Sequence, residues 1–260
     1  MSRLVLVLLD GLAAAEAAEH MSFLAALTGA GMARHTVLTA ELPPLSRPIY
    51  ATLLTGKTPV ETGIVRNTDA RVCTAPTLFS RARKAGLTTA AAAYHWMSEL
   101  CNRAPFVPSR DRLSDDPALP VSHGLFYTED AYPDAELFHD AEALRHRYAP
   151  DLLLVHSMGI DFAGHAAGAS SRPYREAVRA ADALLAAAVP AWLAWGAVVL
   201  ITSDHGMDAE GSHSDTTGAA RRVPFWLVGA PPGVFADALL PVRQTDIAPL
   251  AARLLGIPWS

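Results

Sequence analysis

Five short apolar runs place the strongest constraint on how this chain can fold. They occupy residues 3–9, 88–94, 151–156, 197–202 and 223–228, and most carry apolar residues at successive positions rather than at alternate ones. A strand with this pattern buries both of its faces, as strands do in a parallel sheet that helices cover. The runs therefore predict the inner strands of such a sheet.

Longer segments with helical periodicity alternate with these runs. They cover residues 19–29, 46–55, 77–85, 135–148, 171–193 and 245–255. Strands that alternate with helices predict an α/β fold, with a doubly wound, mostly parallel central sheet and helices on both faces. At 260 residues and 51% hydrophobic content, we expect one domain over residues 1–260. Residues 101–133 are rich in Pro, Asp and Ser, and we interpret them as a surface excursion that forms a small cap or lid.

Charge and composition narrow the classes of partner. The formal net charge is −5, which gives no reason to expect a nucleic acid polymer. The run before Asp10 lacks a cleavage region, so it predicts a buried strand rather than a signal peptide. No uninterrupted apolar stretch approaches the roughly 20 residues that span a bilayer. Cys73 and Cys101 form neither a CxxC pair nor a disulfide framework. We expect a cytoplasmic protein with no membrane partner and of unknown oligomeric state.

Acids and histidines follow three of the predicted strands. Asp10 ends the first strand, the motif "GIDFAGH" carries Asp161 and His165, and "SDHGMDAEGSH" carries Asp204, His205 and His213. Ligands of open α/β sheets bind beyond the carboxyl ends of the strands, so we expect these side chains to meet. Carboxylate and imidazole together suit Zn²⁺ or Mn²⁺. Each fragment alone fits an ordinary turn or helix cap, but their coincidence at one sheet edge predicts a metal site.

Ser46 lies where a Pro-rich loop turns into a predicted helix. A hydroxyl at that point faces free backbone N–H groups and the positive end of the helix dipole, which suits an anionic substrate. The alternative is an ordinary serine at a helix N-cap. A serine hydroxyl is a weak nucleophile at neutral pH unless a base or a metal activates it, and the acids and histidines supply a means of activation.

Four ordered motifs resemble those of the alkaline phosphatase superfamily, and most closely its nucleotide pyrophosphatase/phosphodiesterase-like branch. They are "VLLDG", "PPLSRPIYATLLTGKTPVETGI", "GIDFAGH" and "TSDHGMDAEGSH". The resemblance implies two divalent metal ions, with zinc the expected metal and manganese the alternative, and a covalent phosphoserine intermediate. It also implies that Ser46 is the nucleophile and that Asn67 holds a phosphoryl oxygen.

The resemblance further implies how the metal ligands divide between the two ions. The first ion is held by Asp10, Ser46, Asp204 and His205. The second ion is held by Asp161, His165 and His213. Within the last motif, Asp208 and Glu210 are expected to be solvated spacers.

Arg47 departs from the phosphodiesterase branch, which often places an aromatic residue directly after the nucleophile. We keep two interpretations, an arginine that binds a second anionic group of the substrate and a solvated surface residue. Tyr94, Trp96, Phe126 and Tyr127 are candidates for a substrate pocket or for packing. His156 ends a predicted strand and is interpreted as structural.

The sequence thus predicts a metal-dependent phosphohydrolase of the phosphodiesterase type that acts on a small-molecule phosphate ester or phosphonate. A phosphomonoesterase, a phosphonate hydrolase or a phosphotransferase remains open, because one metal core can serve all of them. The alternative outside the enzyme classes is a metal-binding protein without turnover.

Overall fold

Eight strands form one sheet in a computed structural model that describes residues 3–214, 216, 218–230 and 240–259. Their order across the sheet is β2-β8-β7-β1-β6-β3-β5-β4. The strands are β1 (Arg3–Leu9), β2 (Ala33–Thr39), β3 (Thr89–Tyr94), β4 (Leu113–Asp115), β5 (His123–Tyr127), β6 (Leu152–Ser157), β7 (Ala197–Thr202) and β8 (Arg222–Val228). The centre of the sheet is parallel, because β1 pairs with β6 and β7 and β3 pairs with β5 and β6 in that sense. The pairs β2–β8, β7–β8 and β4–β5 are antiparallel.

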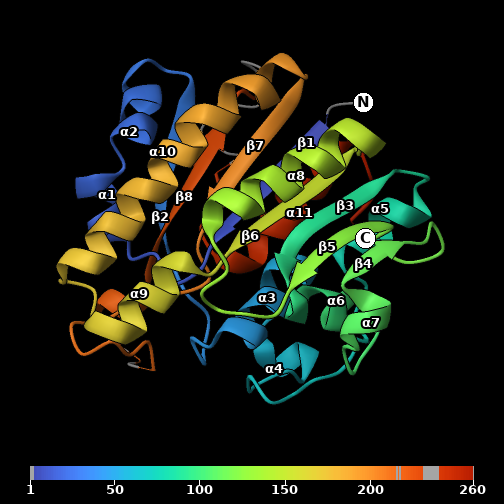
Figure 1. Ribbon diagram of the computed structural model, residues 1–260, viewed down its shortest axis with the longest axis horizontal. Coiled ribbons are helices and arrows are strands. Elements are labelled where there is room, and N and C mark those ends of the chain that lie inside the picture. The colour runs from blue at the N-terminus through green and yellow to red at the C-terminus, as the bar shows by residue number, and fades with distance from the viewer. Residues whose placement is uncertain (1–2, 215, 217, 231–239, 260) are drawn as a thin grey trace.

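Helices cover both faces of the sheet (Figure 1). One face carries α3 (Ser46–Thr55), α5 (Leu78–Lys84), α6 (His95–Cys101) and α11 (Ile247–Leu255). The other face carries α1 (Ala14–His20), α2 (Ser22–Gly29), α8 (Asp134–Tyr148), α9 (Gly159–Ala167) and α10 (Arg172–Ala194). The short elements are α4 (Pro59–Thr62), α7 (Pro108–Asp111) and the 3-10 turns η1 (Gly218–Arg221) and η4 (Gln244–Asp246).

The two cores meet back to back along β1. Leu4, Leu6 and Leu8 belong to the cluster on the α3 and α11 side, and Val5 and Val7 belong to the cluster on the α10 side. Successive side chains of a strand point to opposite faces, so a strand that is apolar throughout supplies both cores at once. The predicted doubly wound, mostly parallel α/β fold is confirmed.

The helix predicted over residues 19–29 is confirmed from Ser22 to Gly29, but its start is wrong, because two helices meet at Met21. The backbone of Met21 is not helical, with φ −99° and ψ 73°. Asp182 on α10 accepts hydrogen bonds from the backbone N–H groups of Phe23 and Leu24, at 2.8 and 3.3 Å. A carboxylate from a distant helix therefore satisfies the free donors at the start of α2 and stabilises the break.

The apolar runs in the sequence did not predict three of the strands, namely β2, β4 and β5. β2 and β4 lie at the two edges of the sheet, and β5 lies next to β4. Two of these strands fall within residues 101–133, so that this segment extends the central sheet through the pairing of β5 with β3. The segment is therefore not wholly irregular, and its expected use as a cap over the site stays a prediction.

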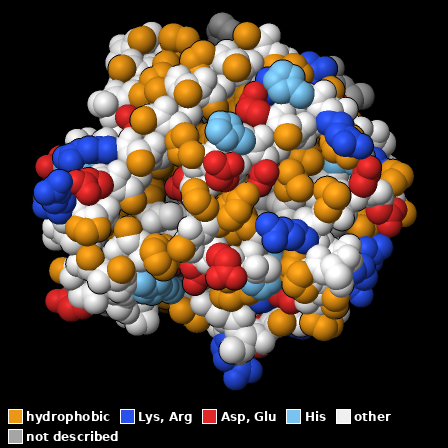
Figure 2. Space-filling view, in the orientation of Figure 1, with side chains coloured by type: hydrophobic (Ala, Val, Ile, Leu, Met, Phe, Trp, Pro, Cys, Tyr) orange, Lys and Arg blue, Asp and Glu red, His pale blue; other side chains and the backbone are white. Residues whose placement is uncertain are grey.

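Helix α10 has the length and apolar composition that could cross a membrane. In the structure it packs against β7, α9 and the α1–α2 pair, and Tyr174, Leu185 and Trp192 on it are fully buried. These contacts bury one side of α10, whose remaining residues are half-buried or exposed. On the face shown in Figure 2, basic and acidic side chains are interspersed rather than gathered into a field of one sign.

A substitution of Leu154 tests how much the buried side chains of the sheet contribute to the free energy of unfolding, because Leu154 lies on β6 and is 1% exposed. Leu154→Ala should lower the free energy of unfolding by about 2–5 kcal/mol, since it leaves a cavity beside a central strand. Val60→Ala, at a position 80% exposed, should change it by no more than about 0.5 kcal/mol. Urea denaturation measures both, and equal losses for the two variants would contradict this description of the core.

Candidate metal centre and active site

The carboxyl ends of three neighbouring strands bring the predicted acids together. β1 lies between β6 and β7, and in register Leu8 pairs with both His156 and Thr202. The chain leaves β1 at Asp10 and leaves β7 two residues before Asp204, while β6 runs on into α9, which carries Asp161. All three carboxylates are buried.

Gly11 permits the close approach of these three segments. Its φ is +71°, in the left-handed region, and a Cβ atom at this position would lie 2.8 Å from Cα of Asp161. Only glycine avoids both the backbone strain and this clash. The backbone N–H of Gly11 also donates to Oδ1 of Asp204 at 3.2 Å. This turn therefore fixes the position of Asp204 relative to α9.

The loop from residue 206 to residue 213 brings a second imidazole to the site. Oδ1 of Asp208 accepts hydrogen bonds from the backbone N–H groups of Glu210 at 3.0 Å and Ser212 at 2.7 Å. The prediction that Asp208 is a solvated spacer is wrong, because its carboxylate folds the loop; Glu210 is exposed. The folded loop places the ring of His213 nearly parallel to that of His205, with 3.7 Å between ring centroids.

Each of the three predicted histidine ligands is anchored through Nδ1 to a backbone carbonyl. Nδ1 of His165 donates to Gly211 O at 2.8 Å, that of His205 to Gly206 O at 3.0 Å, and that of His213 to Pro44 O at 2.8 Å. A neutral imidazole that donates through Nδ1 keeps a lone pair on Nε2. Metal-binding histidines are oriented in the same way.

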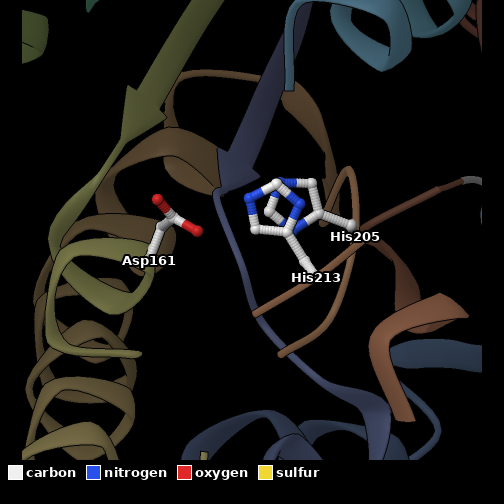
Figure 3. A group of neighbouring side chains, drawn as sticks. All are labelled: Asp161, His205 and His213. Atoms are coloured by element: carbon white, nitrogen blue, oxygen red, sulfur yellow. The ribbon is translucent and has the colours of Figure 1, made fainter. Parts of the chain in front are cut away.

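Two groups of side chains have spacing that suits a metal ion. Ligand atoms of Asp10, Asp204 and His205 lie within 4.8 Å of one another, and so do those of Asp161, His205 and His213. Figure 3 shows the carboxylate of Asp161 directed toward the stacked imidazoles. Nε2 of His165 is 3.4 Å from Oδ2 of Asp161. The structure thus brings all six residues together, and their division between two ions stays a prediction.

The chemistry of these groups fits a divalent cation. Oδ1 of Asp10, Oδ1 of Asp161 and Oδ2 of Asp204 are buried and receive no hydrogen bond from any described residue. An unpaired buried carboxylate oxygen is costly unless a cation compensates for it. Carboxylate oxygens and imidazole nitrogens are the ligands of zinc sites outside the thiolate class.

Burial controls the titration of these groups. It raises the pKa of Asp10 and of Asp161 well above their ordinary value, and raises that of Asp204 to about 6. The charge of Asp204 adds to the pKa shift of both other acids. Burial lowers the pKa of His205 to about 3 and that of His213 to about 4. Neutral imidazoles beside carboxylates whose pKa values are raised form a site that lacks positive charge.

Ser46 lies beside this site, at the first position of α3. Its Oγ is 3.1 Å from Nε2 of His205, and because Nδ1 of His205 carries the proton, the hydroxyl donates this hydrogen bond. The backbone N–H of Arg47 is already bonded to Oδ1 of Asn67, and Pro48 has no N–H. Neither residue therefore offers a free backbone N–H to an anion.

Arg47 is buried, so its interpretation as a solvated surface residue is wrong. Its Nη2 lies 2.7 Å from Oε2 of Glu99, and its guanidinium stacks on Trp96 with Cζ 4.4 Å from the ring centroid. Its Nε donates to the backbone carbonyl of Asn67 at 2.7 Å. Arg47 thereby holds Asn67 at both the backbone and the side chain, and its own charge is balanced by Glu99.

Sequence reasoning missed two residues that contact Asp10, namely Tyr50 and His156. The hydroxyl of Tyr50 donates to Oδ2 of Asp10, and Nε2 of His156 is 3.3 Å from the same oxygen. Tyr50 follows Ser46 by one helical turn, and His156 is the next-to-last residue of β6, which pairs with β1, so the sequence places both residues near the site. The aromatic candidates Phe126 and Tyr127 are buried, and the hydroxyl of Tyr127 donates to the carbonyl of His156 at 2.7 Å.

This arrangement agrees with a known family. The model of the type I phosphodiesterase / nucleotide pyrophosphatase family matches residues 4–218. The chain belongs to this family. The family is part of the alkaline phosphatase superfamily, as the four ordered motifs predict.

Two solved structures show the same fold. An inactive form of murine ectonucleotide pyrophosphatase/phosphodiesterase 5 in complex with AMP superposes with a TM-score of 0.71 at 12% identity, over 100% of this chain and 96% of that one. The C-terminal periplasmic domain of EptC from Escherichia coli in complex with Zn has a TM-score of 0.67 at 15% identity, over 99% and 83% of the two chains.

Curated relatives by sequence include two ethanolamine phosphate transferases. GPI ethanolamine phosphate transferase 1 of Mus musculus is 32% identical over 132 residues, which is 42% of this chain and 14% of the relative. The catalytic subunit of GPI ethanolamine phosphate transferase 2 of Homo sapiens is 22% identical over 99% of this chain and 26% of the relative. The chain therefore spans about a quarter or less of the length of these relatives.

Metal binding by the acid and imidazole groups is directly testable. Chelator-treated protein should bind Zn²⁺ and gain thermal stability from it, because a ligand that binds the folded state stabilises that state. Asp204→Asn should lower Zn²⁺ affinity more than about 100-fold, a larger loss than residues that only orient a ligand produce. Equilibrium dialysis with elemental analysis measures both effects. Glu210→Gln, in the same loop but exposed, is the control, and equal zinc contents in all three proteins would contradict the site.

Proposed function

We propose that the protein is a divalent-metal-dependent enzyme that cleaves a small-molecule phosphate ester, with Ser46 as its nucleophile. The observation that carries the proposal is the position of Ser46 Oγ, 3.1 Å from His205 Nε2 and at the start of a helix, within the buried acid and imidazole groups. A nucleophile placed there meets an anionic phosphoryl group at the positive end of the helix dipole.

His205 is a poor general base for Ser46. Burial lowers its pKa to about 3, so its imidazole holds a proton only weakly at neutral pH. Its Nε2 lone pair, which here accepts the Ser46 hydroxyl, suits a metal instead. Asp10, Asp204 and His205 would hold one divalent ion, and Asp161, His165 and His213 would hold another. The positive charge of such ions would make the Ser46 hydroxyl reactive and stabilise charge on the phosphoryl oxygens.

In the proposed reaction, Ser46 Oγ gives up its proton to solvent and attacks phosphorus while the bond from phosphorus to the leaving-group oxygen breaks, and that oxygen takes up a proton from solvent. Asn67 directs its Nδ2 donors at a non-bridging phosphoryl oxygen, because Oδ1 accepts from the Arg47 N–H. Arg47 acts by holding Asn67, since Glu99 already balances its charge. Water then cleaves the phosphoserine ester and restores the Ser46 hydroxyl.

Ser46→Ala should abolish turnover and leave the fold and the metal content unchanged, because the substitution removes one oxygen atom from a helix terminus. The wild-type protein, quenched during turnover of a phosphodiester, a monoester or a phosphonate, should carry a phosphoryl adduct on Ser46 that intact-mass and peptide spectrometry detect. Retained turnover in the variant would exclude the covalent mechanism. A metal-loaded wild-type protein that turns over no member of the substrate panel would favour the metal-binding protein without turnover.

Transfer to an alcohol is the second candidate function. The relatives by sequence are named ethanolamine phosphate transferases, and the match extends over 99% of this chain in one of them. In the structure the side chain of His165 is 48% exposed, so the site opens to solvent at this residue. An acceptor hydroxyl can take the place of water in the second step, since both attack the same phosphoserine ester.

A partition experiment separates hydrolysis from transfer. During turnover with increasing glycerol or ethanolamine, a hydrolase should form free phosphate or phosphomonoester in nearly constant yield. A transferase should form the phosphorylated alcohol in a yield that rises with acceptor concentration and saturates, because it binds the acceptor. Phosphorus NMR of the products measures the ratio. Saturable transfer would overturn the hydrolase assignment, and its absence would overturn the transferase.

A further inference from the structure

The two carboxylate oxygens of Asp10 have different surroundings. Oδ2 receives the hydroxyl of Tyr50 and lies 3.3 Å from Nε2 of His156. Oδ1 receives no hydrogen bond from any described residue and lies 3.5 Å from Nε2 of His205. The carboxylate is surrounded by Tyr50, His156 and His205, all of which are fully buried. One oxygen is therefore held by the protein, and the other is directed at the proposed ion.

His156 must act as the donor in its contact with Asp10. An ionised carboxylate only accepts hydrogen bonds, so Nε2 carries the hydrogen and Nδ1 is left as an acceptor. Nδ1 is buried and has no hydrogen-bond partner among the described residues. An unpaired buried ring nitrogen costs free energy, so stability alone does not favour a histidine at this position.

Tyr50 links the held oxygen to the nucleophile. It lies on α3, one turn after Ser46, so the helix that presents the hydroxyl also presents the donor for Asp10. The Tyr50 ring meets His156 edge to face, with 4.7 Å between centroids and 74° between planes. Its hydroxyl also lies 3.5 Å from the sulfur of Met158. These contacts fix the Tyr50 hydroxyl from several sides.

We propose that Tyr50 and His156 are positioning residues that hold Asp10 as a one-oxygen ligand and thereby set the metal affinity and selectivity of the Asp10–Asp204–His205 group. This inference rests on the metal centre of the proposed function. A carboxylate with one oxygen occupied by two donors does not chelate an ion through both oxygens. That restriction suits Zn²⁺, which takes about four ligands, and disfavours Ca²⁺, which takes about six to eight and often binds carboxylates through both oxygens.

Tyr50→Phe is the main test, because it removes the donor and keeps the ring that packs on His156. Competition titration of the chelator-treated protein should show Zn²⁺ affinity lower by about 10–100-fold, the usual effect of removing a group that holds a ligand. The ratio of Zn²⁺ affinity to Ca²⁺ affinity should fall in the same titration. The visible absorption bands of the Co²⁺-substituted protein should shift, since the carboxylate changes its mode of binding.

Matched variants separate this role from packing. Tyr132→Phe removes another hydroxyl that donates to a carboxylate, that of Asp140 at 2.9 Å, and should leave the affinity and the Co²⁺ spectrum unchanged. His156→Gln keeps an N–H near the position of Nε2, whereas His156→Leu does not. The glutamine variant should retain more Zn²⁺ affinity than the leucine variant. Circular dichroism confirms that each variant is folded, and the histidine pair stands as the test if Tyr50→Phe does not fold.

The outcomes separate the inference from the proposed function. A wild-type protein that binds no Zn²⁺ would overturn the metal centre and this inference together. Zinc binding by the wild type with unchanged affinity and Co²⁺ spectrum in Tyr50→Phe would overturn the inference alone. Equal losses of Zn²⁺ affinity in Tyr50→Phe and Tyr132→Phe would also overturn the inference. So would equal Zn²⁺ affinities in the two His156 variants.

Discussion

The buried carboxylates of Asp10, Asp161 and Asp204 lie together at the carboxyl ends of the central parallel strands. The surrounding structure has to accommodate three acidic groups in one buried place. Burial raises the pKa of each acid, and the charge of Asp204 raises the pKa of both others further. The local backbone serves the same cluster, since the Gly11 N–H bonds to Asp204 and the Gly11 turn leaves room for α9. A divalent cation would supply the charge that such a cluster lacks.

The sheet explains why residues far apart in sequence reach one site. Central strands of a parallel sheet end at the same edge, and here β1 has β6 on one side and β7 on the other. This placement requires that the three strands be buried and in register. Their apolar sequences account for the burial, and the register pairs Leu8 with both His156 and Thr202. The same scaffold carries many chemistries, so substrate choice depends on the residues around Ser46 rather than on the sheet.

The parts that were predictable from sequence are those that local patterns determine. The bounds of β1, β7 and α3 agree with the apolar runs and the helical period, because each of these elements is buried along its length. The six acids and histidines were found because each follows a strand or shares a short motif.

The parts that sequence did not reveal depend on tertiary contacts. The break between α1 and α2 is stabilised by Asp182 from α10, which no local pattern indicates. Burial of Arg47 depends on Glu99 and Trp96, which come from α6, and His156 resembles any histidine at the end of a strand. Edge strands such as β2 have less need for continuous apolar sequence, because neighbours cover them less completely.

The exposure of His165 divides the centre into two halves with different access to solvent. The Asp10–Asp204–His205 half is sealed, whereas the side chain of His165 is 48% exposed beside Asp161. Exchange of a bound ion requires incoming water or another ligand to reach it. In the proposed two-ion centre, an ion on the Asp161 side would therefore exchange with the surrounding pool faster than an ion held by Asp10, Asp204 and His205.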